Sequence, residues 1–163
     1  MSSLFSHAEP APNVGSSPSQ VALSHQAEVP VATDRAFEGF TDYIHLWWPA
    51  EVYSKGGPGT HISLDADGLN EELDDGQVFV AAELLEAVSG EYLELRVTDG
   101  FEHLAPSRLR VTFTATVTGT RVQLVHDGFD AAHGGEQRAY YGYWAPALRR
   151  YARFMGAHEA DNA

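Results

Sequence analysis

Hydrophobic and polar residues alternate with a period of two through the middle of the chain. Within residues 107–117, the odd-numbered positions from Leu109 to Val117 are all apolar, whereas the even-numbered positions are Arg or Thr. This alternation is typical of a β-strand with one buried and one solvated face. Weaker versions of the pattern predict further strands over residues 60–64, 77–88, 92–98 and 121–129. Only short turn sequences separate several of these strands, and we therefore expect an antiparallel meander built from hairpins.

The segment before the meander predicts one strand followed by two short helices. Apolar residues from position 20 onward indicate a strand that ends at Pro30. Thr33 or Asp34 can cap a following helix, because its side-chain oxygen can accept a hydrogen bond from an unpaired N–H of the first turn. A second short helix is expected over residues 43–48, where Pro49 ends it.

The chain closes with a predicted long helix over residues 135–156. Its apolar residues recur at spacings of three and four, which is the stripe that packs against a sheet: Tyr141, Trp144, Ala145, Leu148, Ala152 and Met155. Pro146 has no N–H to donate to the carbonyl of Gly142, so a bend is expected there. The pattern predicts an α+β fold in which a curved antiparallel sheet wraps around this helix. We expect the domain to cover residues 20–156, between a disordered leader over 1–19 and a tail over 157–163.

Composition excludes several classes of function. The 10 Lys and Arg against 23 Asp and Glu leave a net charge of −13, which disfavours nucleic acid and anionic membranes as partners. The absence of cysteine excludes disulfides and thiol chemistry. No apolar run is long enough to span a bilayer, and the first residues do not resemble a secretory signal, so a cytoplasmic location is expected. The histidine spacing does not predict a metal site, and no cofactor is expected.

Some local motifs resemble functional loops but fail in detail. The glycines after Lys55 do not form a phosphate-binding loop, because Lys55 precedes them. The acidic run over 65–75 has Asn70 where a calcium loop needs Gly, and a solvated hairpin edge is expected instead. Glu83 and Glu86 fall on opposite phases of one predicted strand, so they are not expected to face each other.

His126 is the most informative polar residue. It shares its strand phase with Val122 and Leu124, so its imidazole is expected to point inward toward the long helix. A buried imidazole needs a hydrogen-bond partner. One interpretation is a structural histidine bonded to a carboxylate, a tyrosine hydroxyl or a carbonyl. The other is an acid–base or ligand-anchoring group in the wall of a cavity.

Several passages resemble motifs of the SRPBCC, or START-like, superfamily. Residues 30–41 are similar to its first strand-to-helix passage, and the Trp47-Trp48 pair follows at the expected place. Residues 119–129 are similar to its G-T-x-V…L-x-H-x-G-W motif, with Phe129 in place of the last Trp. Gly-Tyr-Trp at 142–144, with Leu148, resembles the start of its last helix, although Tyr143 is inserted. Within the superfamily, the chain most resembles the C-terminal domain family of the activator of the heat-shock-protein-90 ATPase, over about residues 20–156.

This resemblance implies a helix-grip fold with a cavity between the concave sheet and the last helix. Relatives bind lipids, sterols or polyketides, cyclise aromatic precursors, or act as partner-binding modules, and they share no common catalytic residue. The first hypothesis is therefore non-catalytic binding of a small apolar or amphipathic ligand. Its predicted contacts are six residues expected in the walls of that cavity: Trp48, Leu95, Phe113, His126, Tyr141 and Trp144.

Two alternatives remain open at this point. A cyclase- or aromatase-like enzyme could use His126 as general base and Tyr141 as proton donor. A protein-interaction or stress-response module could use the surface around Trp47 and Trp48, and a homodimer is compatible with that hypothesis.

Overall fold

The structure is a computed structural model that describes residues 21–158. The predicted leader over 1–19 and most of the predicted tail over 157–163 lie outside the described residues. Seven antiparallel strands form one curved sheet in the order β1-β7-β6-β5-β4-β3-β2. The strands are β1 (Leu23–Val29), β2 (His61–Asp65), β3 (Gly68–Glu72), β4 (Val78–Val88), β5 (Tyr92–Val97), β6 (Ser107–Ala115) and β7 (Thr120–Asp127).

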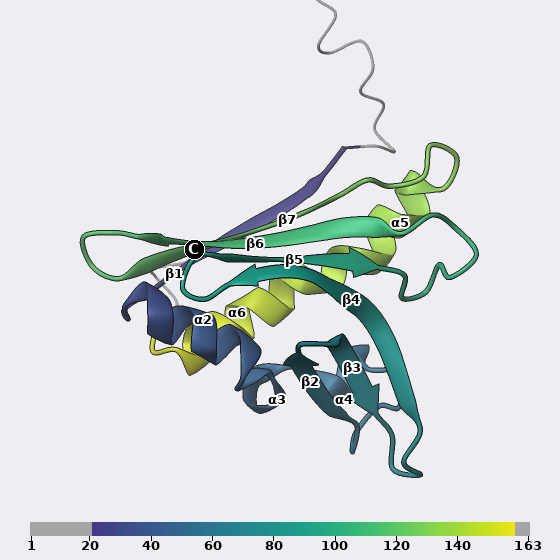
Figure 1. Ribbon diagram of the computed structural model, residues 1–163, viewed down its shortest axis with the longest axis horizontal. Helices are drawn as coiled ribbons and strands as arrows, with labels where there is room; N and C mark the ends of the chain where they lie inside the picture. Colours follow the sequence, from purple (N-terminus) through teal and green to yellow (C-terminus); the bar gives the residue numbers. More distant parts are fainter. Residues whose placement is uncertain (1–20, 159–163) are drawn as a thin grey trace, which may run out of the picture.

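The helices lie on one side of this sheet, as Figure 1 shows. Three short ones follow β1: α2 (Thr33–Thr41), α3 (Ile44–Trp47) and α4 (Ala50–Tyr53). The chain then ends in α5 (Gly134–Tyr140), a 3₁₀ turn η3 (Tyr141–Tyr143) and α6 (Trp144–Phe154). The last helix runs beneath the concave face, so the predicted α+β helix-grip arrangement is confirmed.

The period-two pattern correctly identifies the buried face of the sheet. Leu109, Val111 and Phe113 of β6 are buried, as are Val122, Leu124 and His126 of β7. Val117, in contrast, is fully exposed, because β6 already ends at Ala115 and the chain turns there. Among the described residues, no helix is long and apolar enough to cross a bilayer.

The acidic run over 65–75 is not the solvated hairpin edge that we expected. Its middle forms β3, which pairs with β2 on one side and β4 on the other. Leu69 and Glu71 of this strand are buried. Apart from Gly68, only Leu69 in β3 is non-polar, so the alternation that reveals the other strands is too weak to see here.

The C-terminal helix is interrupted, but at a different place from the one expected. The break is the η3 turn, and Pro146 is the third residue of α6. An N–H at that position has no partner within the helix, so the proline costs no intrahelical hydrogen bond. The carbonyl of Gly142 accepts from the Trp144 N–H within the turn rather than staying free.

Two smaller expectations about the helices are also wrong. Neither Thr33 nor Asp34 caps α2, because the N-cap residue is Ala32 and it makes no side-chain cap hydrogen bond. The helix α4 was not predicted, since its four residues are too few for a periodic pattern.

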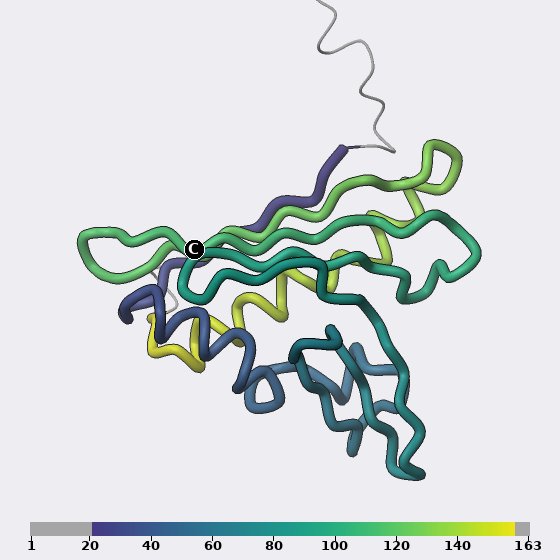
Figure 2. Tube along the Cα trace, in the orientation of Figure 1, coloured from purple at the N-terminus to yellow at the C-terminus, as the bar shows by residue number. Residues whose placement is uncertain are grey.

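A β-bulge in β4 changes the phase of that strand. Leu84 pairs with Leu95 and Glu86 pairs with Glu94, so Leu85 is the extra residue. Glu83 and Glu86 consequently lie on the same face, not on opposite faces, because the bulge shifts the alternation by one residue. Figures 1 and 2 show β4 curving away from β5 and carrying the β2–β3 hairpin below the other strands.

Candidate functional site

The six residues predicted to contact a ligand are all buried, with exposed fractions of 5% or less. Several of their rings pack closely against one another. The Trp48 ring lies 5.5 Å from that of Trp144, and the His126 ring lies 4.4 Å from that of Tyr141. Leu95 and Phe113 lie on the concave face, on β5 and β6. All six side chains are therefore part of the core, and their contact with a ligand stays a prediction.

His126 is hydrogen-bonded inside the core. Its Nε2 lies 2.8 Å from the Oγ of Ser107, and the rings of Phe129 and Tyr141 flank it. Burial lowers the pKa of His126 to about 3, because the imidazolium form would lose its hydration. The imidazole is therefore neutral near pH 7.

The hydroxyl of Tyr141 is also engaged by the protein. It donates to the backbone carbonyl of Asp99 at 2.5 Å. Burial raises the pKa of Tyr141 above its ordinary value, because the phenolate would be desolvated. His126 and Tyr141 thus touch through their rings but direct their polar atoms at Ser107 and Asp99.

A buried carboxylate that sequence analysis did not single out lies beside this pair. Asp99, just after β5, is 4% exposed, and its Oδ2 accepts from the hydroxyls of Tyr140 at 3.1 Å and Tyr143 at 3.5 Å. The η3 turn places these tyrosines around it. Burial raises the pKa of Asp99, and the two phenols offset part of that effect. Its partners lie more than 40 residues away along the chain, which explains why no local motif reveals the cluster.

A second buried carboxylate, Glu71 of β3, lies on the other side of Lys55. Glu71 accepts the backbone N–H of Lys55 at 2.8 Å, and the Lys55 Nζ lies 4.0 Å from Asp99 Oδ1. Burial and the charge of Asp99 both raise the pKa of Glu71. We call Asp99, Glu71, Lys55, Tyr140 and Tyr143 the Asp99 cluster; in it the Lys55 ammonium group faces Asp99, and the Lys55 backbone N–H bonds Glu71.

Six buried polar atoms have no hydrogen-bond partner within residues 21–158, and three of them belong to residues described above: His126 Nδ1, Trp144 Nε1 and Asp99 Oδ1. Such atoms are rare in folded proteins. Each could pair with a polar group of a ligand or with an ordered water. Within the same residues, no group of three His, Asp or Glu side chains is arranged to hold a metal ion.

An apolar hollow of about 200 Å³ opens between α2, β2 and the β4–β5 pair. Its apolar lining consists of Phe37, Leu64, Ala66, Leu84, Ala87 and Leu93, and its polar lining of Thr41, Asp42 and Asp65. We call it the α2 hollow. It was not predicted, since its walls come from four segments that are distant in the sequence.

The bulge in β4 shapes the α2 hollow. Leu84 and Ala87 are three residues apart, and in a regular strand they would point to opposite faces. Because Leu85 is bulged, Leu84 pairs with Leu95 and Ala87 pairs with Leu93, so both lie on the concave face. Phe37 then separates the hollow from the interior, with its ring 5.3 Å from that of Phe113. The hollow therefore lies one aromatic ring away from a predicted ligand contact.

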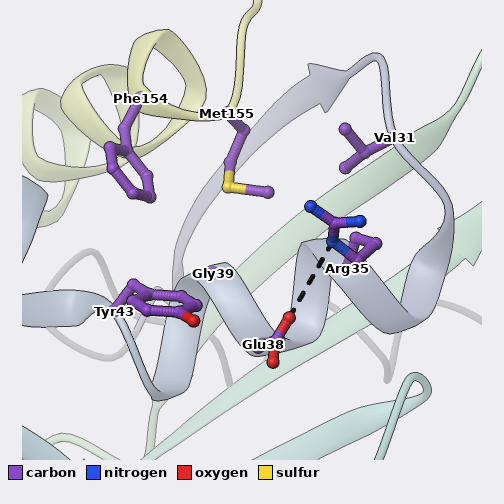
Figure 3. A pocket seen from close by; sticks show the side chains of 7 residues that line it. All are labelled: Val31, Arg35, Glu38, Gly39, Tyr43, Phe154 and Met155. Carbon is purple, nitrogen blue, oxygen red and sulfur yellow. Dashed lines mark ion pairs between the residues drawn. The ribbon is translucent and has the colours of Figure 1, made fainter.

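Two other hollows lie beside the last helix. Figure 3 shows one of about 320 Å³ between α2 and the end of α6, where Phe154 and Met155 approach Tyr43. It uses the opposite side of α2, and the Arg35–Glu38 ion pair lies in its wall. A third hollow, of about 290 Å³, separates β1 from α6 and includes His25 and Arg149. The first of these lies between two helices, and the lining of the second is more polar than that of the α2 hollow.

Comparison with known proteins supports the fold. No family model matches the chain, and no curated protein sequence is similar to it. Among solved structures, the AHSA1 protein from Silicibacter pomeroyi is 18% identical, with a TM-score of 0.57 and coverage of 83% of this chain and 97% of that one. The AHSA1-like protein from Aeromonas hydrophila is 18% identical, with a TM-score of 0.54 and coverage of 85% and 98%.

A third similar structure comes from a biosynthetic locus. DynU16, a protein of the dynemicin biosynthetic locus, is 17% identical, with a TM-score of 0.56; the match covers 86% of this chain and 48% of that one. At these identities the likeness speaks to architecture and not to activity. The chain thus shares its helix-grip architecture with these AHSA1-like structures.

Proposed function

We propose that this protein binds a small amphipathic molecule, without catalysis, and that the α2 hollow receives its apolar part. The observation that carries the proposal is the apolar lining of the hollow on the concave face, with polar groups only at its rim. A concave, mostly apolar site with a few polar groups is the usual form of a small-molecule site. The likeness to structures that share the helix-grip fold is compatible with this role.

The size of the hollow limits the ligand. At about 200 Å³ it is smaller than the roughly 300 Å³ at the low end of drug-sized pockets, so it suits a short alkyl chain or one ring. Burial of five methylene groups at roughly 0.8 kcal/mol each contributes about 4 kcal/mol, which corresponds to a Kd near 1 mM. Movement of Phe37 would lengthen the site toward Phe113 and Leu95, the nearest of the predicted contacts.

The test is to fill the hollow. Ala87→Phe places a ring among the lining residues, and Ala115→Phe is a matched control at an exposed position of β6. Binding of 1-octanol, followed by methyl NMR shifts of Leu84 and Leu93, should weaken at least tenfold in Ala87→Phe and stay unchanged in Ala115→Phe. Equal octanol binding by all three proteins, or no octanol-dependent shifts in the unmodified protein, would refute the proposal.

A further inference from the structure

The rim of the α2 hollow is acidic. Of the nine residues that line the hollow, two are aspartates, Asp42 and Asp65, and none is basic. Asp42 follows α2 directly, and Asp65 ends β2. Both aspartates are exposed, so their charges face the solvent at the entrance and carry no burial cost. An anionic headgroup at this entrance would meet two like charges.

The backbone adds to this negative potential. Asp42 is the C-cap residue of α2, so the carbonyl end of the helix lies at the rim. The C-terminus of a helix carries a partial negative charge and favours cations. Arg35, the basic residue on α2, lies two turns before Asp42, lines the neighbouring hollow together with it, and forms an ion pair with Glu38 at 3.9 Å. Arg35 is not among the residues that line the α2 hollow itself.

The rim carboxylate of Asp65 is held in place before any ligand arrives. Its Oδ1 accepts the backbone N–H of Asp67 at 2.9 Å and lies 3.4 Å from the Asn70 amide nitrogen. These bonds fix the side chain within the β2–β3 turn. A group positioned in this way loses less conformational entropy when a ligand binds.

A second acidic hollow continues from the rim along α2. It shares Phe37, Thr41 and Asp42 with the α2 hollow, and its other lining residues are Asp34, Arg35, Glu38 and Ser89. Asp34, Glu38 and Asp42 follow one another at intervals of four residues, so they form one acidic stripe on the helix. Arg35 is the one base against these three acids, so a positively charged headgroup leaving the apolar hollow would meet a net negative charge in this direction as well.

We propose that the ligand of the α2 hollow is an amphipathic cation, namely an amine or quaternary ammonium group attached to a short alkyl or aryl body. The apolar body contacts Leu84, Ala87 and Leu93, while the ammonium group lies at the rim beside Asp42 and Asp65. This inference rests on the proposed ligand-binding function and adds the chemical class of the ligand to it. The main support for this proposal is that a cationic headgroup complements the charge of the rim. The rim has two carboxylates and a helix C-terminus, and no basic residue lines the hollow.

The experiment compares three probes that share one alkyl chain: octylammonium, 1-octanol and octanoate, each used below its micelle-forming concentration. Calorimetric titration at low ionic strength should place octylammonium at least tenfold tighter than octanoate, with octanol between them. The double variant Asp42→Asn with Asp65→Asn should weaken octylammonium about three- to tenfold and leave octanol unchanged. Asparagine keeps an oxygen that can accept the Asp67 N–H, so the turn is retained.

A matched control removes the same charge elsewhere. Asp74 and Asp75 are exposed aspartates in the turn before β4, outside the α2 hollow, and their double Asn variant should leave all three affinities unchanged. If the three probes bind equally, or if the control variant weakens octylammonium as much as the rim variant, the inference fails while the hollow remains a ligand site. If none of the probes binds, the proposed function itself fails.

Discussion

At the scale of single residues, His126 shows how the core can keep a buried imidazole neutral. Its Nε2 pairs with Ser107, two aromatic rings cover it, and burial keeps it neutral. A general base that operates near neutral pH usually has a pKa close to that pH. A pKa of about 3 makes His126 a weak base, and this favours the structural interpretation over the enzymatic one.

The neutral state of His126 predicts a pH dependence of stability. Its pKa is about 3 in the folded protein and 6.5 in the unfolded chain, so the unfolded chain binds more protons between these values. The contribution of His126 is therefore complete above pH 6.5 and is lost as the pH falls toward 3. As the pH falls from 7 to 5, the titration of this residue should lower the unfolding free energy by about 2 kcal/mol.

The measurement is urea unfolding at pH 7 and pH 5 for the unmodified protein and for His126→Gln, whose amide does not titrate. The unmodified protein should lose more stability between the two pH values, by about 2 kcal/mol. Buried acids such as Asp99 and Glu71 act in the opposite direction in both proteins, so they cancel in the difference. Identical pH slopes would show that His126 is not neutral and desolvated in the folded state.

At the scale of helices and strands, the sequence predicts what depends on local period and misses what depends on pairing. The predicted strand over 92–98 is β5, and that over 77–88 is β4, because alternation is a property of neighbouring residues. The bulge at Leu85 depends on the register with β5, so it leaves no local signal. The α2 hollow depends on that bulge, and the sequence alone could not predict it.

The Asp99 cluster escaped prediction for a related reason. Glu71 reads as one more solvated acid in an acidic run, and nothing near it in sequence indicates burial. Its partner, the Lys55 N–H, is 16 residues away, and Asp99 meets its tyrosines across more than 40 residues. Five of the six buried residues were predictable because each follows a strand or helix period, whereas Trp48 comes directly after the short helix α3 and follows no such period.

The position of Pro146 gives a test at the scale of one helix. A proline in the interior of a helix costs about 3 kcal/mol, so its replacement by alanine there would stabilise the protein by about that amount. As the third residue of α6, Pro146 breaks no hydrogen bond. Pro146→Ala should instead lower the unfolding free energy by about 0.5–1 kcal/mol, because the unfolded chain gains freedom.

Thermal or urea unfolding of Pro146→Ala decides between these two outcomes. Ala145→Pro is not a suitable control, since it creates a second proline in the same turn. Ala139→Pro, within α5, is better because its ring would interrupt that helix and should destabilise the protein by about 3 kcal/mol or more. A Pro146→Ala protein that gains 2 kcal/mol or more would restore the interpretation of Pro146 as a strained kink.

At the scale of the whole molecule, acidic charge is placed both on the surface and inside. The net charge of −13 keeps anionic partners away and agrees with the cation preference proposed for the α2 hollow. The Asp99 cluster joins the α4–β2 loop, β3, the end of β5 and the break in the last helix. Burial of ionised carboxylates there lowers the unfolding free energy of the whole protein, and this destabilisation increases with pH.

Replacement of one of these acids should stabilise the entire fold. Burial raises the pKa of Asp99, so its contribution to stability is greatest below its unfolded pKa of 3.8 and is lost as the pH rises through the folded pKa. Asp99→Asn keeps an oxygen that can accept from Tyr140 and Tyr143 but removes the buried charge. At pH 7 the variant should unfold with a free energy about 1 kcal/mol higher than that of the unmodified protein.

Asp130→Asn is the matched control: hydrogen bonds from His133 and Ala132 lower the pKa of Asp130, so that variant should be less stable at pH 7. Urea unfolding at pH 7 and pH 4 measures both, and the gain of Asp99→Asn should shrink at pH 4. A stability loss in Asp99→Asn at pH 7 would show that the ion pair with Lys55 outweighs the burial of the carboxylate.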